Sequence, residues 1–305
     1  MLDRWRAWAP SPTAVRRAFL GALVVNIGIV VTGGAVRLTA SGLGCPTFPR
    51  CTDDSLVVTR EMGGHGLVEF GNRLLTFALS AVVVLAVVVA WRAGRRDLRR
   101  LALVLLAGIV AQALLGGVTV LTGLNPVTVM AHFLVSMVLV AVATVALERS
   151  GGRPTEARTL VHPALLRAGQ ALVVVTAGLL VAGTVVTGSG PHSGDRNATH
   201  RLPFDVVEVT QLHADLVFLL VGLALGLAFA LRATAEPLDL RRRSGQLLVV
   251  VLAQGAVGYA QYVTDLPVAL VMVHLLGACL VWVAALRLLL GMTERVARPG
   301  QGPGS

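Results

Sequence analysis

Residues 111–134, AQALLGGVTVLTGLNPVTVMAHFL, are repeated at residues 253–276 as AQGAVGYAQYVTDLPVALVMVHLL. The two segments align without a gap, and the alignment places His132 of the first copy on His274 of the second. Self-similarity at one fixed offset is the signature of a chain built from repeated units. The sequence therefore predicts two related halves, each with a histidine in its last helix.

The whole chain is too apolar for an ordinary soluble domain. Apolar residues make up 55% of it and charged residues 14%, and the mean hydropathy is +0.77. A helix needs about 20 apolar residues to cross a bilayer. The sequence thus predicts an all-α polytopic membrane protein with eight transmembrane helices in the lipid bilayer. The predicted spans are 16–38, 66–91, 101–122, 127–147, 166–187, 208–231, 245–264 and 268–291.

Each predicted half contains an even number of helices, so both halves enter the membrane in the same orientation. Their pseudo-symmetry axis should run along the membrane normal, and equivalent residues should lie at equal depth. We expect two tandem four-helix bundles side by side, with sites inside each bundle. The predicted units are an N-terminal half at 1–150, a C-terminal half at 160–295 and a flexible tail at 296–305.

The formal net charge of +10 comes from arginines in short loops between the spans. These arginines lie neither on an amphipathic face nor beside aromatic residues, so the charge does not indicate a nucleic-acid partner. Every second connection is arginine-rich, which by the positive-inside rule predicts an inner (plasma) membrane protein with both termini in the cytoplasm. No cleavable signal peptide is evident. The topogenic arginines are Arg4, Arg6, Arg16, Arg17, Arg92, Arg95, Arg96, Arg99, Arg100, Arg149, Arg153, Arg158, Arg241, Arg242, Arg243, Arg295 and Arg298.

Two of the three cysteines lie in the first predicted outer loop, in the run GLGCPTFPRC. An oxidising compartment would let Cys45 and Cys51 form a disulfide, and the alternative is a pair of reduced thiols. A metal site is less favoured because no further ligands of suitable spacing accompany them. Cys279 lies within the last span and is best explained as a small packing residue.

Three histidines lie inside predicted spans, about one turn from the outer ends of the fourth, sixth and eighth helices. They are His132, His213 and His274. A single histidine in a membrane often only bonds to a neighbouring helix. Three at one depth point instead to function. Imidazole is the usual axial ligand of heme in helical bundles, so we interpret His213 and His274 as a bis-histidine site for heme b.

The first half has no histidine at the position related to His213, which falls at or next to Asn72. Instead, Glu69 lies in the apolar stretch with Arg73 at the i+4 spacing of an ion pair. Two interpretations stay open: a salt bridge that neutralises both residues, or a carboxylate poised over a bound substrate. His65 lies two turns nearer the outer surface, about 10 Å from Asn72 along the axis, which is too far to replace it as a ligand.

Arg37, at the outer end of the first helix, either pairs with a heme propionate or marks the membrane interface. The remaining histidines, His162, His192 and His200, lie in loops, where a histidine is usually solvated.

Taken together, these motifs resemble the heme A synthase family over nearly the whole chain. The resemblance is carried by TGGAVRLTASGLGCPTFPRC at 32–51, EFGNR at 69–73, AHF at 131–133, QLH at 211–213 and MVH at 272–274. It implies an oxidoreductase that acts on a CH group, converting heme O to heme A by two successive oxidations of a ring methyl to a formyl group. Heme O synthase would be the donor of the substrate, and cytochrome oxidase the destination of the product.

The resemblance also implies roles for individual residues. His213 and His274 would hold a heme b cofactor in the C-terminal half, and His132 would bind the substrate heme in the N-terminal half. Glu69 would be the catalytic acid. Cys45 and Cys51 match the family's outer-loop pair, which forms a redox-active or structural disulfide.

The chain departs from the family pattern in two places. Many members have a histidine where this chain has Asn72, and some have a further cysteine pair in the second outer loop that is lacking here. We therefore expect His132 to hold the substrate heme from one side, with Asn72 or His65 adjusting the opposite face and with Arg73 and Arg37 nearby. The sequence leaves the electron acceptor, the source of the formyl oxygen and a homo-oligomer open.

Two other functions compete with this interpretation. A membrane electron carrier with one or two b hemes would need bis-histidine sites, and the asparagine at position 72 counts against a second one. A transporter with repeat symmetry would place polar residues near the midplane, whereas here they gather near the outer surface.

Overall fold

The computed structural model describes residues 9–152, 156–195 and 200–296. Arg4, Arg6, Arg153 and Arg298, and the predicted tail from residue 297 onward, lie outside these ranges. Eight long helices dominate, and each is long and apolar enough to cross a membrane. They are α2 (Pro12–Leu38), α3 (Gly63–Arg92), α4 (Arg96–Leu121), α5 (Pro126–Ser150), α6 (Pro163–Ser189), α7 (Val206–Ala233), α8 (Leu238–Val263) and α9 (Val268–Gly291). The predicted all-α multi-pass membrane protein is confirmed.

The helices differ from the predicted spans mainly at their first turns. Four begin with a side chain that caps the first backbone N–H groups, and these helices start one to four residues ahead of the predicted apolar stretch. Three of these caps precede a proline, which suits the first helical position. The capping residues are Ser11, Asn125, His162 and Asp205.

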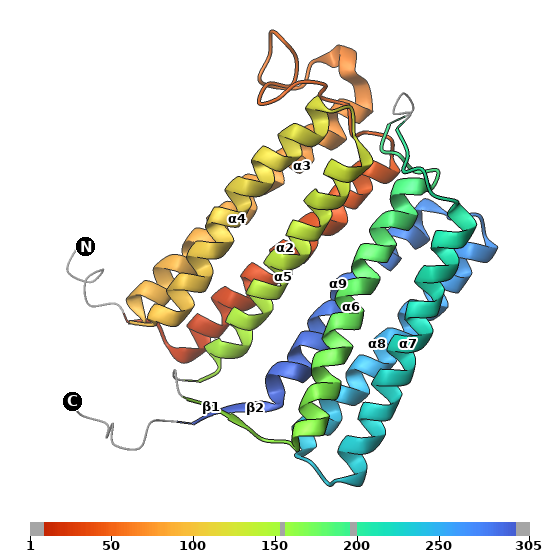
Figure 1. The fold of residues 1–305 in the computed structure, drawn as a ribbon. Coiled ribbons are helices and arrows are strands. Elements are labelled where there is room, and N and C mark those ends of the chain that lie inside the picture. The colour runs from red at the N-terminus through yellow and green to blue at the C-terminus, as the bar shows by residue number, and fades with distance from the viewer. Residues whose placement is uncertain (1–8, 153–155, 196–199, 297–305) are drawn as a thin grey trace.

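Two small elements lie outside the predicted pattern. A 3-10 turn, η1 (Arg60–Met62), leads into α3. Strands β1 (Glu156–Thr159) and β2 (Thr293–Val296) pair antiparallel. The strand pair joins the connection between the two halves to the segment that follows the last helix (Figure 1).

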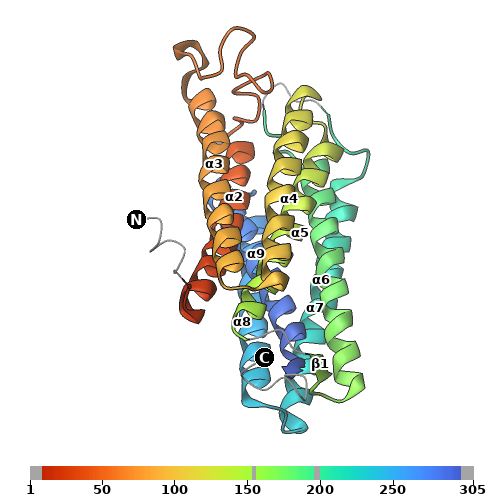
Figure 2. The ribbon, with the colours of Figure 1, turned by 90° about the vertical axis from the view of Figure 1, so that its left-hand side faces the viewer.

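Each half is a ring of four antiparallel helices. Consecutive helices pack together, and α2 closes on α5 as α6 closes on α9. The halves meet along α2, α5, α6 and α9. Figure 1 shows the two rings side by side, and Figure 2 shows from a second side that their helices run along a common direction.

The repeat is visible in the backbone as well as in the sequence. The α4–α5 turn holds Gly123 and Leu124 at φ 61° and 60°, and the α8–α9 turn holds Asp265 and Leu266 at φ 57° and 58°. These are left-handed conformations that close the last turn of a helix. Related residues therefore adopt one geometry, although glycine in the first turn is replaced by aspartate in the second.

Polar contacts tie the halves together across their interface. The Trp282 indole of α9 donates to the carbonyl of Met137 on α5 at 2.9 Å. Nearer the helix ends, Glu148 of α5 accepts from Arg243 of α8 at 2.7 Å and from Arg287 of α9 at 2.8 Å. Both halves thus share one carboxylate at the arginine-rich end.

The two ends of the molecule are packed differently. We call the end with the 39–59 and 190–205 connections the loop end and the opposite end the arginine-rich end. In the first ring, the buried apolar core lies toward the arginine-rich end. Its residues nearest the loop end are Val30 on α2, Leu79 on α3, Ile109 on α4 and Met137 on α5. The buried apolar core of the second ring is arranged in the same way, and its residues nearest the loop end are Leu172, Leu220, Val251 and Val281.

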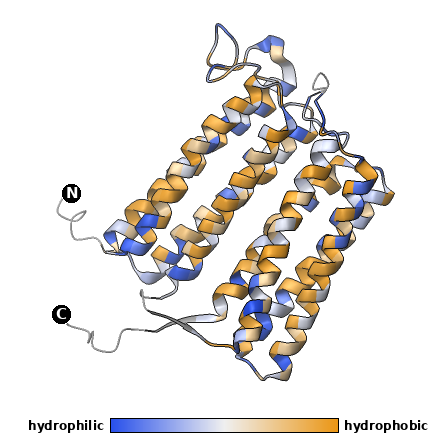
Figure 3. Ribbon diagram, in the orientation of Figure 1, coloured by the Kyte–Doolittle hydropathy of each residue, from blue (hydrophilic) through white to orange (hydrophobic). Residues whose placement is uncertain are grey.

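Among the described residues, the helix segments at the loop end therefore lack buried apolar side chains facing one another. Apolar residues occupy most of the length of each long helix, as expected for helices that cross a membrane (Figure 3). The fold thus provides two rings that are solidly packed at one end and loosely filled at the other.

Candidate functional site

The three intramembrane histidines lie in the loosely filled part of the rings. His132 and His274 are each the seventh residue of their helix, and His213 is the eighth residue of α7. They are therefore nearly two turns inside the helix ends, deeper than the one turn expected. The predicted equality of depth for the repeat-related pair holds.

Each of these imidazole rings lies against a glycine of the neighbouring helix. A Cβ atom on that glycine would come within 3.2 or 3.3 Å of the ring Cε1 atom, so even an alanine would require the ring to shift by a few tenths of an ångström. The glycine leaves room for the Cε1 edge of the ring beside the neighbouring helix. The pairs are His132 with Gly116, His274 with Gly258, and His213 with Gly183.

The Nδ1 atoms of all three rings are buried and have no hydrogen-bond partner among the described residues. A buried polar atom without a partner is costly and is usually explained by a bound group. Two glutamines fix the backbone at two of these histidines. Gln112 donates to the carbonyl of His132 at 2.9 Å, and Gln254 donates to the carbonyl of His274 at 2.8 Å.

His213 and His274 come from helices on opposite sides of the second ring, α7 and α9. An orphaned Nδ1, a glycine beside the ring and an imidazole from the opposite helix fit a bis-imidazole site for a heme.

In the first ring, Asn72 of α3 stands where His213 stands in the second. Its Oδ1 accepts a hydrogen bond from the hydroxyl of Thr32 on α2 at 2.8 Å. The carboxamide is therefore fixed by α2, the counterpart of the helix that carries Gly183. His132 lies on α5, across the ring from α3, so the first ring carries one imidazole and one amide on these helices.

Glu69 is buried and bound on both carboxylate oxygens. Oε1 accepts from Arg73 at 2.5 Å, and Oε2 accepts from the backbone N–H of Cys45 at 2.6 Å. Arg73 also donates to the carbonyls of Cys45, Thr47 and Arg50 at 3.0–3.2 Å. The salt bridge considered from the sequence is formed, and it holds the first outer loop down on the bundle.

The loop that this ion pair holds contains the predicted disulfide. Cys45 and Cys51 are bonded, and both side chains are fully buried. The sequence indicated the pairing but not that the loop around it is clamped by two charged residues of α3.

Arg37 connects the two halves at the loop end. Its Nε donates to the carbonyl of His192 at 2.8 Å and its Nη2 to the carbonyl of Thr187 at 2.7 Å. Burial and the charge of Arg37 lower the pKa of the His192 imidazole. Beside them the backbone N–H of Gly42 donates to the carbonyl of Gly194 at 2.8 Å, so the first and second outer loops touch.

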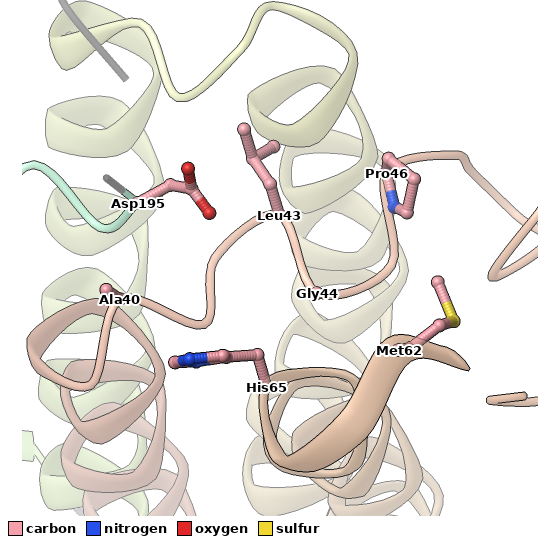
Figure 4. Close-up of a pocket in the computed structure, with 7 residues that line it drawn as sticks. All are labelled: Ala40, Leu43, Gly44, Pro46, Met62, His65 and Asp195. Atoms are coloured by element: carbon pink, nitrogen blue, oxygen red, sulfur yellow. The ribbon is translucent and has the colours of Figure 1, made fainter. Parts of the chain in front are cut away.

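His65 lies above the ring rather than in it. Its Nδ1 is 3.0 Å from the hydroxyl of Ser41, and it lines a pocket of about 420 Å³ that opens between the outer loops (Figure 4). Figure 4 shows the ring of His65 directed toward Ala40, with Asp195 of the second outer loop on the same side of the pocket. His65 therefore belongs to the rim of the site, two turns from Asn72 as expected.

A protein-family model described as cytochrome oxidase assembly protein, COX15-CtaA, matches residues 16–193, more than half of the chain. The chain belongs to this family. The matched region covers the whole first ring, the disulfide loop and α6. The resemblance seen in the sequence motifs is thereby confirmed.

Individual relatives match over a shorter stretch. The chain is 32% identical over 124 residues to a heme A synthase of Lysinibacillus sphaericus and 32% identical over 122 residues to one of Listeria welshimeri. These alignments cover 39% of this chain and 40% of each relative. A heme A synthase of Bacillus cereus is 30% identical over 118 residues, 37% of both proteins. The chain thus matches about two fifths of the length of these relatives.

Several residues of the site escaped sequence reasoning. Gly116 and Gly258 are related by the repeat, and their conserved spacing to the histidines was a readable signal. Thr32 and Gly183 carried no comparable signal, because they reach the site only through the packing of α2 on α3 and of α6 on α7.

Proposed function

We propose that this protein is a heme A synthase, which oxidises a ring methyl of heme O to a formyl group in two successive steps and so supplies heme A to cytochrome oxidase. The observation that carries the proposal is the set of three histidines at the loosely packed end of two related rings, each with a glycine beside it and an orphaned Nδ1. Membership of the cytochrome oxidase assembly family supports it.

The second ring would hold the heme b cofactor between His213 and His274. The two imidazoles come from opposite helices of this ring, α7 and α9. Gln254 holds the turn that carries His274 by donating to the carbonyl of His274. When bound, heme supplies the iron chemistry that the side chains of the protein lack. The protein contributes the two imidazoles, the apolar walls and the exclusion of water.

The first ring would bind heme O as substrate, with His132 on one side. Asn72 would not replace a histidine as a strong ligand, because a carboxamide is not among the usual axial ligands of heme; its Oδ1 accepts from Thr32. The opposite face of the substrate would therefore meet a hydrogen-bonding amide, with His65 at the rim. Arg37 and Arg73 bring positive charge to the loop end, where it would attract the propionates.

Glu69 would act as the catalytic carboxylate. Its Oε2 is bound to the Cys45 N–H, and its Oε1 to Arg73, so its position depends on the disulfide loop. We propose that loosening of this loop frees one oxygen to take a proton from the substrate. In the closed loop, both oxygens are fully engaged.

The cytoplasmic position of both termini and the plasma membrane location are part of the same proposal, supported by the arginines of alternate connections. A heme O synthase would deliver the substrate.

The cofactor assignment is tested by purifying the protein in detergent and recording the reduced pyridine hemochrome spectrum. His213→Ala and His274→Ala should each remove most of the bound heme b, because one imidazole is lost from a two-ligand site. His200→Ala, in an outer loop, is the control and should retain it. Retention of heme b in both ring variants would show that these histidines do not ligate it.

The activity is tested by co-expression with a source of heme O and chromatography of the extracted hemes. Wild type should convert heme O to heme A, and His132→Ala should not. A b-type membrane electron carrier is the second candidate, favoured only by the His213 and His274 pair. It would retain heme b and yield no heme A at all.

A further inference from the structure

A second pocket lies at the arginine-rich end of the second ring, away from the histidines. It has a volume of about 380 Å³ and lies where the last turn of α7 meets the first turns of α8. Its lining residues are Arg232, Leu238, Arg241, Arg242 and Gly245. Nothing in the proposed heme chemistry uses it.

Some neighbouring arginines at this end of the molecule are paired with carboxylates. Arg95 donates to both oxygens of Asp97 at 3.0 Å. Arg243, next in sequence to the pocket, pairs with Glu148 and with Asp239, both at 2.7 Å. Within the described ranges, by contrast, no ion pair joins any of the three pocket arginines to an acid. The pocket therefore concentrates unmatched positive charge.

The guanidinium groups are partly fixed and still have donors to offer. Arg232 donates from Nη1 to the carbonyl of Ala228 at 2.8 Å. Its Nη2 lies 3.5 Å from where a Cβ of Gly245 would be, so it rests over the backbone of α8. The Nε of Arg241 is buried and has no hydrogen-bond partner in the part of the chain that the structure describes. Because this Nε is closed off, the terminal N–H groups of Arg241 are the donors that would meet an acceptor in the pocket.

Helix α8 adds to the preference for an anion. It starts at Leu238 after Pro237, and no side chain caps its first N–H groups. The start of a helix carries partial positive charge and exposed donors. Asp239, in the first turn, is turned to Arg243 and pairs with it. Planar guanidinium groups and a helix start together suit the oxygens of a phosphate group.

The surface below the pocket distinguishes a lipid from a soluble phosphate. Val249 and Leu252 continue the face of Gly245 along α8 and are 67% and 52% exposed, while Phe229, one turn from Arg232 on α7, is 73% exposed. An apolar strip thus runs from the pocket toward the middle of the membrane-spanning helices. It offers contact to acyl chains directly beneath the arginines.

We propose that this pocket binds the phosphate group of an anionic phospholipid, with its acyl chains along the apolar strip. Basic pockets between membrane helices are suited to such headgroups, because their cationic side chains lie at the depth of the headgroup and carry the opposite charge. The site is independent of the heme site and would anchor the α7–α8 turn.

The test is a titration of the full-length protein in neutral detergent with short-chain phosphatidylglycerol, followed by thermal unfolding. Phosphatidylcholine, which has the same phosphate but no net charge, and inorganic phosphate are the parallel titrants. Phosphatidylglycerol should stabilise the wild type most. Arg241→Gln with Arg242→Gln should weaken its apparent affinity by about fivefold for each arginine removed.

The repeat provides a matched control. DLRR at 97–100 aligns with DLRR at 239–242 at the offset that joins the two copied segments, so Arg99→Gln with Arg100→Gln removes the same charge at the same depth. The control should keep the wild-type response. Equal loss in control and pocket variants, no preference of wild type for phosphatidylglycerol over phosphatidylcholine, or equal stabilisation by inorganic phosphate would each overturn the proposal. Arg242→Gln alone, at an exposed side chain, covers the case in which the double variant does not fold.

Discussion

Replacing Arg73 by glutamine should release the first outer loop while the rings beneath stay folded. Arg73 makes four hydrogen bonds, one to Glu69 and three to loop carbonyls. The Glu69 side chain is 7% exposed and that of Arg73 22%, so water cannot replace these bonds at no cost. Removing one partner of a largely buried ion pair costs about 3–5 kcal/mol.

The cost should appear as easier opening of the loop, because the buried apolar core of the ring begins only at Leu79 on α3. At 1.4 kcal/mol for each factor of ten, 3–5 kcal/mol predicts amide exchange about 10² to 4 × 10³ times faster in residues 43–51. Hydrogen exchange read by mass spectrometry measures this directly. Arg50→Gln removes one exposed bond to the carbonyl of Asp53 and is the control, with an expected change below about tenfold.

Glu69→Gln tests the same pair from its other side. Since each single change breaks one ion pair, their effects on loop exchange should not add when both are made. Unchanged exchange of residues 43–51 in Arg73→Gln, or fully additive effects, would refute the view that the pair clamps the loop.

The same two variants separate anchoring from chemistry. If Glu69 serves only as an anchor, then Glu69→Gln and Arg73→Gln should lower heme A output to a similar extent. If its carboxylate also takes a proton, Glu69→Gln should abolish heme A, while Arg73→Gln should retain part of it.

Three further outcomes follow from the structure. Gly258→Val should lower heme b content by roughly tenfold or more, because overpacking against His274 costs about 1–3 kcal/mol, whereas Gly255→Val, which has open space, should not; the hemochrome spectrum decides. The pKa of His192 is lowered in the folded protein, so the unfolded chain binds more protons below the ordinary histidine pKa. Thermal stability should therefore fall as the pH drops below about 6.5, and the fall should be smaller in His192→Gln. Trp282→Phe should lose the indole bond across the interface of the halves and lower the free energy of unfolding by about 1 kcal/mol, measured by denaturant titration.

Most of the fold could be predicted because a membrane-spanning helix is recognised from the composition of one short segment of sequence. The eight apolar stretches and the copied segment needed no knowledge of packing. What escaped prediction depends on residues distant in sequence. The pairing of β1 with β2 joins positions near 156 and 296, and no local pattern announces such a contact.

The residues of the candidate site divide in the same way, into those that local sequence predicts and those that depend on contacts between distant residues. Histidine depth follows from counting residues along a helix, and the disulfide follows from two cysteines in one loop. The partners of Glu69 do not, because one is a backbone N–H of the loop and its position depends on how residues 39–62 fold back. Arg37 likewise binds carbonyls of the other half, so its role as a cross-link could not be read from its own neighbourhood.

The asymmetry between the rings bears on how a repeated scaffold could separate a resident cofactor from a substrate. If both rings hold heme as proposed, the second closes on it with two imidazoles, His213 and His274. The first offers His132 and an amide already engaged with Thr32, so its ligand would be held by one strong bond instead of two. A substrate has to leave after reaction, whereas a cofactor has to stay. Replacing one imidazole by Asn72 in an otherwise matched ring would weaken retention on the substrate side alone.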